Sequence, residues 1–203
     1  HNATLPFTRF IAGAADYTIC YYRQDFGRLN ADKDSYGVPR SKSIQTTPAH
    51  QLALAAVYYS PLQYMYWYDK PSDSQDEPEL KFFDDVYTTW DDTKVLQGEV
   101  GEFITIARRK GEEWFIGSIT NNEKRVLSVS LDFLPEGKNY IAEIYTDGDK
   151  SVKTRTKVRV STYRVSNKTK LNFCLKASGG GAVRLVPDDG NIKSVKNYKQ
   201  QRL

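Results

Sequence analysis

Two aspartates, Asp16 and Asp69, stand next to aromatic residues and near segments whose composition is typical of β-strands. Asp16 and Tyr17 follow the apolar residues 5–12, and Asp69 follows a short aromatic run that includes Trp67. In a barrel of parallel strands, side chains just beyond the carboxyl ends of the strands face one mouth. Paired carboxylates across a mouth suit glycoside hydrolysis, in which one protonates the leaving oxygen and the other attacks or activates water. The pattern predicts a sugar site, although both aspartates could instead be turn residues, an interpretation that fits Asp69 better than Asp16.

The two histidines give a weaker signal. His1 could contact a substrate or could be a frayed chain end, while His50 lies inside a helical pattern and is better explained as a packing or surface residue than as a catalyst. Two His and two Cys in 203 residues make a zinc site improbable. No residue can be assigned as a metal ligand from the pattern alone.

Residues 1–90 alternate between strand and helix patterns. A strand is predicted over residues 5–12, and Thr47 is a predicted N-cap with Pro48 at the first helical position. A second strand is predicted over residues 62–68 and a second helix from Pro78. This order is typical of α/β folds with parallel strands. Two βα units cannot cover both faces of a parallel sheet, so this half is predicted to be the end of a larger domain.

Residues 91–203 show a different pattern, in which hairpin signals separate strands of period two. The alternation is clearest where Leu127, Val129 and Leu131 are separated by polar residues. This half is predicted to be an antiparallel β-sandwich of about eight strands. The predicted turns are residues 109–112, 121–124, 135–138 and 147–150.

Composition excludes several classes of protein. The formal net charge is +4, which does not indicate a nucleic-acid partner. The longest apolar run, residues 52–68, is interrupted by Ser60 and Pro61, so no membrane span is predicted. Aromatic residues make up 13% of the chain, as expected of a folded protein.

Four long stretches resemble the carboxyl-terminal part of glycoside hydrolase family 97: LPFTRFIAGAADYT, AHQLALAAVYYSPLQ, TTWDDTKVLQGEVGEFITIARRKGEEWFIG and DFLPEGKNYIAEIYTD. The resemblance implies an α-glucosidase or α-galactosidase with an amino-terminal β-sandwich, a catalytic (β/α)8 barrel and a carboxyl-terminal β-sandwich. It also implies an active-site calcium ion and a periplasmic or secreted location. Residues 1–90 would then be the last two βα units of the barrel, and residues 91–203 the final sandwich.

The resemblance also implies which groups lie elsewhere. The general-acid glutamate of the family, which also binds calcium, would precede His1, and the other catalytic carboxylates would lie further upstream. No catalytic residue and no calcium ligand is therefore predicted in this chain. His1, Asp16 and Tyr17 match the pattern around the seventh barrel strand and are predicted, with Trp67 and Asp69, to bind substrate. The stretch YMYWYDKP resembles the retaining, α-galactosidase-like branch rather than the inverting one.

The predicted function is that of the carboxyl-terminal fragment of an α-galactosidase or α-glucosidase, inactive by itself. Its predicted partners are an α-linked oligosaccharide or glycoside and the remainder of the catalytic domain. Two alternatives assign the sandwich a non-catalytic role. It could be a carbohydrate-binding module with an exposed row of aromatic residues, or a structural support for the barrel.

Overall fold

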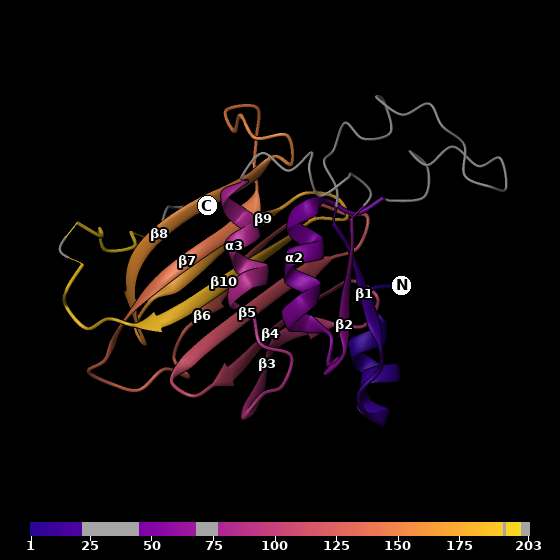
Figure 1. The fold of residues 1–203 in the computed structure, drawn as a ribbon, viewed down its shortest axis with the longest axis horizontal. Helices are drawn as coiled ribbons and strands as arrows, with labels where there is room; N and C mark the ends of the chain where they lie inside the picture. Colours follow the sequence, from indigo (N-terminus) through magenta and orange to yellow (C-terminus); the bar gives the residue numbers. More distant parts are fainter. Residues whose placement is uncertain (22–44, 68–76, 193, 200–203) are drawn as a thin grey trace, which may run out of the picture.

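A computed structural model describes residues 1–21, 45–67, 77–192 and 194–199 (Figure 1). Its first part contains three short 3₁₀ turns, two strands and two helices: η1 (Leu5–Phe7), η2 (Arg9–Ala12), β1 (Tyr17–Tyr21), α2 (Pro48–Val57), β2 (Gln63–Trp67), η5 (Pro78–Leu80) and α3 (Lys81–Asp85). Its second part contains eight strands: β3 (Asp92–Glu99), β4 (Phe103–Lys110), β5 (Glu113–Thr120), β6 (Arg125–Ser130), β7 (Asn139–Asp147), β8 (Val158–Ser166), β9 (Lys170–Leu175) and β10 (Gly180–Pro187).

The eight later strands form two antiparallel sheets. Six of them pair in the order β3-β4-β5-β10-β7-β8, and β6 pairs with β9. Leu127, Val129 and Leu131 are buried between the sheets, as their alternation predicted. The prediction of an antiparallel sandwich of about eight strands is confirmed.

The other face of the six-stranded sheet is covered by helices α2 and α3 (Figure 1). Phe82 of α3 is fully buried, with its ring centroid 6.0 Å from that of Phe115 and 5.3 Å from that of Tyr145. Leu52 of α2 belongs to the same buried cluster. Helices from the first part of the chain therefore share a core with strands from the second part.

Helix α2 begins where the sequence predicted. The Thr47 hydroxyl accepts a hydrogen bond from the backbone N–H of His50 at 3.2 Å, and Pro48 needs no partner at the first position. All ten helical residues are buried, because the helix lies between the sheet and β1. The close approach requires Gly117 on β5: a Cβ there would lie 2.4 Å from the Ala53 carbonyl oxygen.

The predicted strand over residues 5–12 is wrong. These residues form η1 and η2, and none of their side chains is buried. Pro6 lacks a backbone N–H and favours the start of a helical turn, and the Thr8 hydroxyl donates to the Thr4 carbonyl at 3.1 Å. Gly13, at φ +127°, then turns the chain toward β1.

The first strand is instead β1, which pairs in parallel with β2 in a register from Tyr17 opposite Gln63 to Tyr21 opposite Trp67. The predicted second strand and the turn-and-helix after Pro78 are confirmed. All the described helices and the parallel pair precede Trp90, and β3 to β10 follow Asp91. The division into domains at residue 90 stays a prediction, since the shared core crosses it.

Candidate functional site: the carboxyl end of the parallel strand pair

The carboxyl ends of β1 and β2 are the place where an α/β fold would build a site. Both strands run in the same direction, so Tyr21 and Trp67 end them at the same edge. The segments that continue from this edge, residues 22–44 and 68–76, lie outside the described residues.

Asp16 and Tyr17 lie at the opposite, amino end of β1. Tyr17 and Tyr21 are four positions apart, about 13 Å at a strand's rise of roughly 3.3 Å per residue. The expectation that Asp16 and Asp69 face one mouth rested on a strand over residues 5–12, and that premise is wrong. Asp16 precedes its strand, and its side chain is exposed.

The Tyr17 ring has packing partners. Its hydroxyl donates to Gln51 Oε1 at 3.1 Å, and its ring meets that of Tyr58 edge to face at 4.8 Å. Both partners belong to or follow α2, so Tyr17 ties β1 to that helix. A role in binding sugar stays a prediction for Tyr17, as it does for Asp16.

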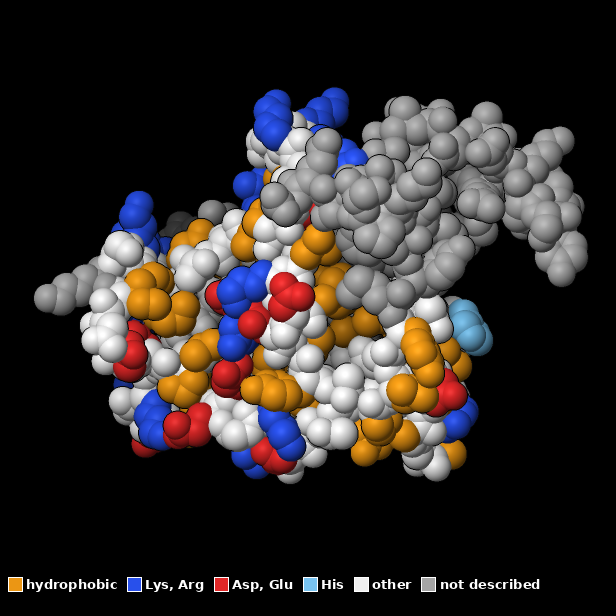
Figure 2. Space-filling model, viewed as in Figure 1, with side chains coloured by type: hydrophobic (Ala, Val, Ile, Leu, Met, Phe, Trp, Pro, Cys, Tyr) orange, Lys and Arg blue, Asp and Glu red, His pale blue; other side chains and the backbone are white. Residues whose placement is uncertain are grey.

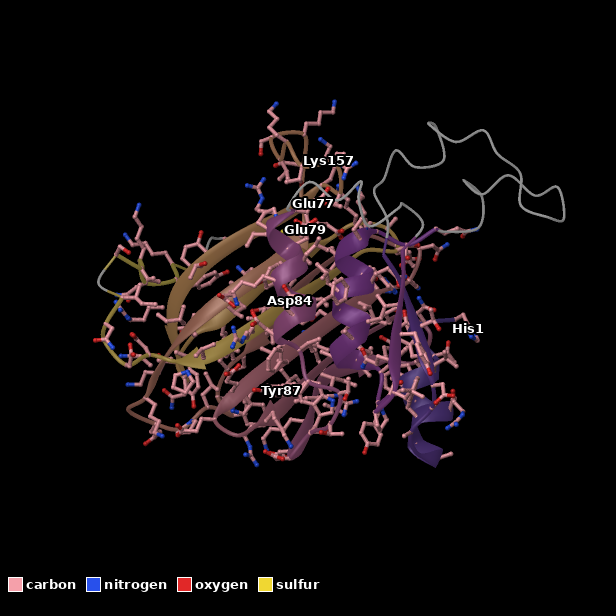
Figure 3. All side chains as sticks on the ribbon, in the orientation of Figure 1. His1, Glu77, Glu79, Asp84, Tyr87 and Lys157 are labelled. Carbon is pink, nitrogen blue, oxygen red and sulfur yellow. The ribbon has the colours of Figure 1, made fainter. Side chains whose placement is uncertain are left out.

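The other predicted site residues are spread over the chain. Trp67 is the last residue of β2 and lies at the carboxyl end, while Asp69 falls outside the described residues. The His1 side chain is exposed and lies away from the other labelled residues (Figure 3). Of the four that the structure describes, Trp67 alone lies at the predicted edge, and substrate binding by the set stays a prediction.

His50 is a packing residue, as predicted. It is 2% exposed, with Nδ1 3.0 Å from the Gly179 carbonyl oxygen and Nε2 3.0 Å from Asn2 Nδ2. A proton on Nδ1 lets the ring donate to Gly179 and accept from Asn2. Burial lowers the pKa of His50 to about 4, so the ring is neutral at neutral pH.

Asp147 at the end of β7 links α2 to the turn before β10. Its Oδ2 accepts from the backbone N–H groups of Lys176 at 2.9 Å and Gly180 at 3.1 Å, and its carboxyl also bonds the Thr47 side chain. Burial raises the pKa of Asp147 against the opposing effect of these hydrogen bonds. The amino end of α2 is therefore held by two strands of the sandwich.

Arg108 of β4 holds the carboxyl end of the same helix. It is 5% exposed, and it donates from Nε to the Ala56 carbonyl at 2.6 Å and from Nη2 to the Val57 carbonyl at 3.1 Å. Its Nη1 donates to Thr93 Oγ1 at 2.8 Å. Burial lowers the pKa of Arg108 to about 10, so the guanidinium remains charged at neutral pH beside the negative end of the helix dipole.

Arg184 of β10 plays the corresponding part for α3. Its Nε lies 2.8 Å from Glu113 Oε2, and its Nη1 lies 2.9 Å from Asp85 Oδ2 and 3.5 Å from Glu143 Oε2. Neither Arg108 nor Arg184 was predicted from the sequence. The sequence did contain a signal for Arg108. It follows Ile104 and Ile106 at every second position, so it lies on the same buried face of β4 as these two residues, the face toward α2.

The sandwich aromatics do not form a sugar-binding row among the residues that the structure describes. Tyr140 and Tyr145 are 2% and 1% exposed. Trp114 is 4% exposed, with Lys94 Nζ 5.9 Å and Arg109 Cζ 6.0 Å from its ring centroid. The exposed large aromatic residues, Tyr59, Tyr64 and Tyr87, all belong to the first part of the chain.

Over the described ranges, no three His, Cys, Asp or Glu side chains are grouped so that they could hold a metal ion. The described residues therefore do not offer the cluster of carboxylates that a calcium ion takes. No described helix is both long and apolar enough to cross a membrane.

Comparisons with known proteins agree with this architecture. Residues 89–186 match a family model described as "Glycosyl-hydrolase 97 C-terminal, oligomerisation". The chain is 33% identical over 187 residues to a retaining α-galactosidase of Bacteroides thetaiotaomicron, which covers 91% of this chain and 27% of that protein. It is 32% identical over 119 residues to a probable retaining α-galactosidase of Streptomyces bingchenggensis, over 58% of this chain and 16% of the other.

Among solved structures, a glycoside hydrolase family 97 enzyme from Pseudoalteromonas sp. strain K8, in complex with acarbose, matches with a TM-score of 0.75. The identity is 34% over 92% of this chain and 28% of that one. The chain thus spans about a quarter of the length of the Bacteroides and Pseudoalteromonas relatives. The β-sandwich and the match of residues 89–186 to the family model together define a carboxyl-terminal domain of a glycosyl hydrolase. More specifically, the chain belongs to glycoside hydrolase family 97.

Proposed function

We propose that this chain is the carboxyl-terminal portion of a longer α-glycoside hydrolase, in which β1, α2, β2 and α3 complete the catalytic barrel. One observation carries the proposal: apolar side chains on β2, just before it and on η2 are exposed. Tyr64 of β2 is 58% exposed, Leu62 49% and Ile11 75%. Figure 2 shows hydrophobic side chains gathered on the side of η1, η2, β1 and β2. Parallel strands are normally covered on both faces, so the preceding barrel strands and helices are the fitting cover.

The proposed reaction is retaining hydrolysis of α-galactosides. It is supported by the two α-galactosidase relatives, although the Pseudoalteromonas relative was solved with acarbose and, as a variant, with panose. α-Glucosides are therefore the alternative substrates. In this scheme the nucleophile and the general acid come from outside the chain, and residues 1–90 supply part of the barrel around them.

The test compares the longer protein with residues 1–203 alone. The longer protein should hydrolyse nitrophenyl α-galactoside, and residues 1–203 alone should not. Because a retaining enzyme releases the α-anomer first, proton NMR of the initial product distinguishes the two stereochemical outcomes. Enzyme-like turnover by residues 1–203, or failure of the longer protein on both α-galactoside and α-glucoside, would overturn the proposal.

For the sandwich itself we propose a supporting role. Arg108 and Asp147 hold the two ends of α2, and Arg184 holds α3, so the sandwich fixes two helices of the proposed barrel. The burial of Trp114 and Tyr140 does not favour the carbohydrate-binding alternative. Glycan-array binding by residues 1–203 that is abolished by a sandwich substitution leaving the urea midpoint unchanged would reverse this preference.

The description of the matched family model adds oligomerisation as a second candidate role. One surface favours it: the outer face of β6 and β9, where Val126 is 54% exposed opposite the exposed Cys174. Val126→Lys should shift the sedimentation coefficient toward the monomer, whereas Val100→Lys, at the 60%-exposed valine of the β3–β4 turn, should not. Equal sedimentation of both variants and the wild type would exclude this face.

A further inference from the structure

The connection between β7 and β8, residues 148–157, lies at the same end of the molecule as the carboxyl ends of β1 and β2 (Figure 1). Figure 3 shows Lys157 of this connection close to Glu77 and Glu79, at the end of α3 where the chain enters it. Under the proposed function this is the substrate end of the barrel, since active sites of such barrels lie beyond the carboxyl ends of the strands. A segment of the sandwich therefore reaches that end.

The connection has a defined conformation. The Gly148 N–H donates to the Lys157 carbonyl at 2.8 Å, which closes the base of the loop. Lys157 adopts a left-handed backbone conformation with φ +57°, and its Nζ donates to the Val152 carbonyl at 3.0 Å. The side chains of Arg155 and Thr156 are thus presented from a closed loop.

Two buried carboxylates receive these side chains. Arg155 donates from Nε at 3.1 Å and from Nη2 at 2.7 Å to Glu77 Oε1, and the Glu77 side chain is only 5% exposed. The Thr156 hydroxyl, on a residue 3% exposed, donates to Oε1 of the fully buried Glu79. Charge-assisted hydrogen bonds in such dry surroundings are strong and directional.

Glu77 and Glu79 stand at a specific point of the chain. They open the turn η5 that leads into α3, and they follow the connection from the carboxyl end of β2. Phe82 then fixes α3 on the sheet through Phe115 and Tyr145. The helix is therefore already secured by its apolar face and by Arg184, and the pairs at Glu77 and Glu79 fix the start of η5 at this end of the molecule.

We propose that Arg155 and Thr156 are positioning residues for the substrate end of the barrel, acting through Glu77 and Glu79. The location of the substrate in this proposal rests on the proposed function. The role of Arg155 and Thr156 in holding Glu77 and Glu79 rests on the observed contacts. It assigns the carboxyl-terminal sandwich a part in substrate binding as well as in support. The proposed ligand at that end is the same α-linked glycoside.

The kinetic test uses the longer enzyme with Arg155→Ala and the control Arg159→Ala. Arg159, on the neighbouring strand, pairs with Asp149 at 3.0 Å and donates to Ser151 Oγ at 3.1 Å; both partners are exposed residues of the same connection, so the control loses a contact of the loop surface and keeps the buried ones. We expect Arg155→Ala to raise KM for an α-linked disaccharide roughly 10-fold with kcat within about 3-fold, because small displacements of binding groups have large effects. Arg159→Ala should match the wild type. Thr156→Val should raise KM likewise, and Thr156→Ser, which keeps the hydroxyl, should restore it.

A second measurement separates this proposal from the proposed function. Hydrogen exchange in the same variants reports on η5 and α3 without any substrate: Arg155→Ala should speed exchange of the Leu80 amide, which donates to the Glu77 carbonyl, whereas Arg159→Ala should not. Unchanged exchange in Arg155→Ala, or equal KM values for the two arginine variants in an active enzyme, would overturn the positioning role. A wild-type enzyme inactive on α-glycosides would instead overturn the proposed function. The exchange result would still decide whether Arg155 holds the chain at Glu77.

Discussion

Acidification below pH 6.5 should destabilise the fold through His50. The ring is buried, donates to Gly179 and accepts from Asn2, and burial holds its pKa near 4. An unfolded histidine titrates near 6.5, so below that pH the unfolded chain binds a proton that the folded chain does not. The stabilisation is complete above pH 6.5 and is lost as the pH falls toward 4. At ~1.4 kcal/mol for each tenfold change in proton activity, the loss is about 3 kcal/mol.

Urea unfolding of residues 1–203 between pH 7.5 and 4.5 measures this loss. His50→Asn keeps a donor for the Gly179 carbonyl and removes the titrating ring, so its pH profile should be flatter than that of the wild type. His1→Asn, which replaces the other histidine of the chain, an exposed one, is the matched control and should keep the wild-type profile. If His50→Asn lost as much stability over this range as the wild type does, the assignment of the pH dependence to His50 would be refuted.

Three substitutions test the contact between the helices and the sheet by urea midpoint. Arg108→Met should cost about 3 kcal/mol, because it leaves two helix carbonyls without donors, whereas Arg109→Met, at the partly exposed neighbour, should cost under ~1 kcal/mol. Gly117→Ala should cost about 3 kcal/mol, because its Cβ would meet the Ala53 oxygen; a neutral result would mean that α2 is not seated on β5. Phe82→Ala should cost about 4 kcal/mol, and a loss below ~1 kcal/mol would show that α3 is detached.

The elements that the sequence predicted correctly are those with local signals. Thr47 and Pro48 specify the start of α2 through a hydrogen bond and a fixed φ, both within one turn. Alternation over residues 127–131 specifies which face of β6 is buried. The error over residues 5–12 arose because apolar composition fits both a strand and an exposed turn. Pro6 was the residue that could have corrected it.

The contacts at the candidate site could not be predicted from local pattern, because their partners lie far apart in sequence. Arg155 meets Glu77 across 78 positions, and Arg108 meets Ala56 across 52. Asp16 was misplaced as a consequence of the strand error, because residues at the two ends of a strand lie on opposite edges of a sheet. Only Arg108 carried a usable signal, a charge at an inward position.

Native-state hydrogen exchange on residues 1–203 tests most directly whether the sandwich supports the proposed barrel helices. If α2 and β5 share one cooperative core, amides of Leu52–Val57 and of Phe115–Ile119 should exchange with free energies equal within about 1 kcal/mol and close to that of global unfolding. Arg108→Met should lower both together. Exchange of the α2 amides at a free energy several kcal/mol below that of β5, unaffected by Arg108→Met, would contradict the supporting role.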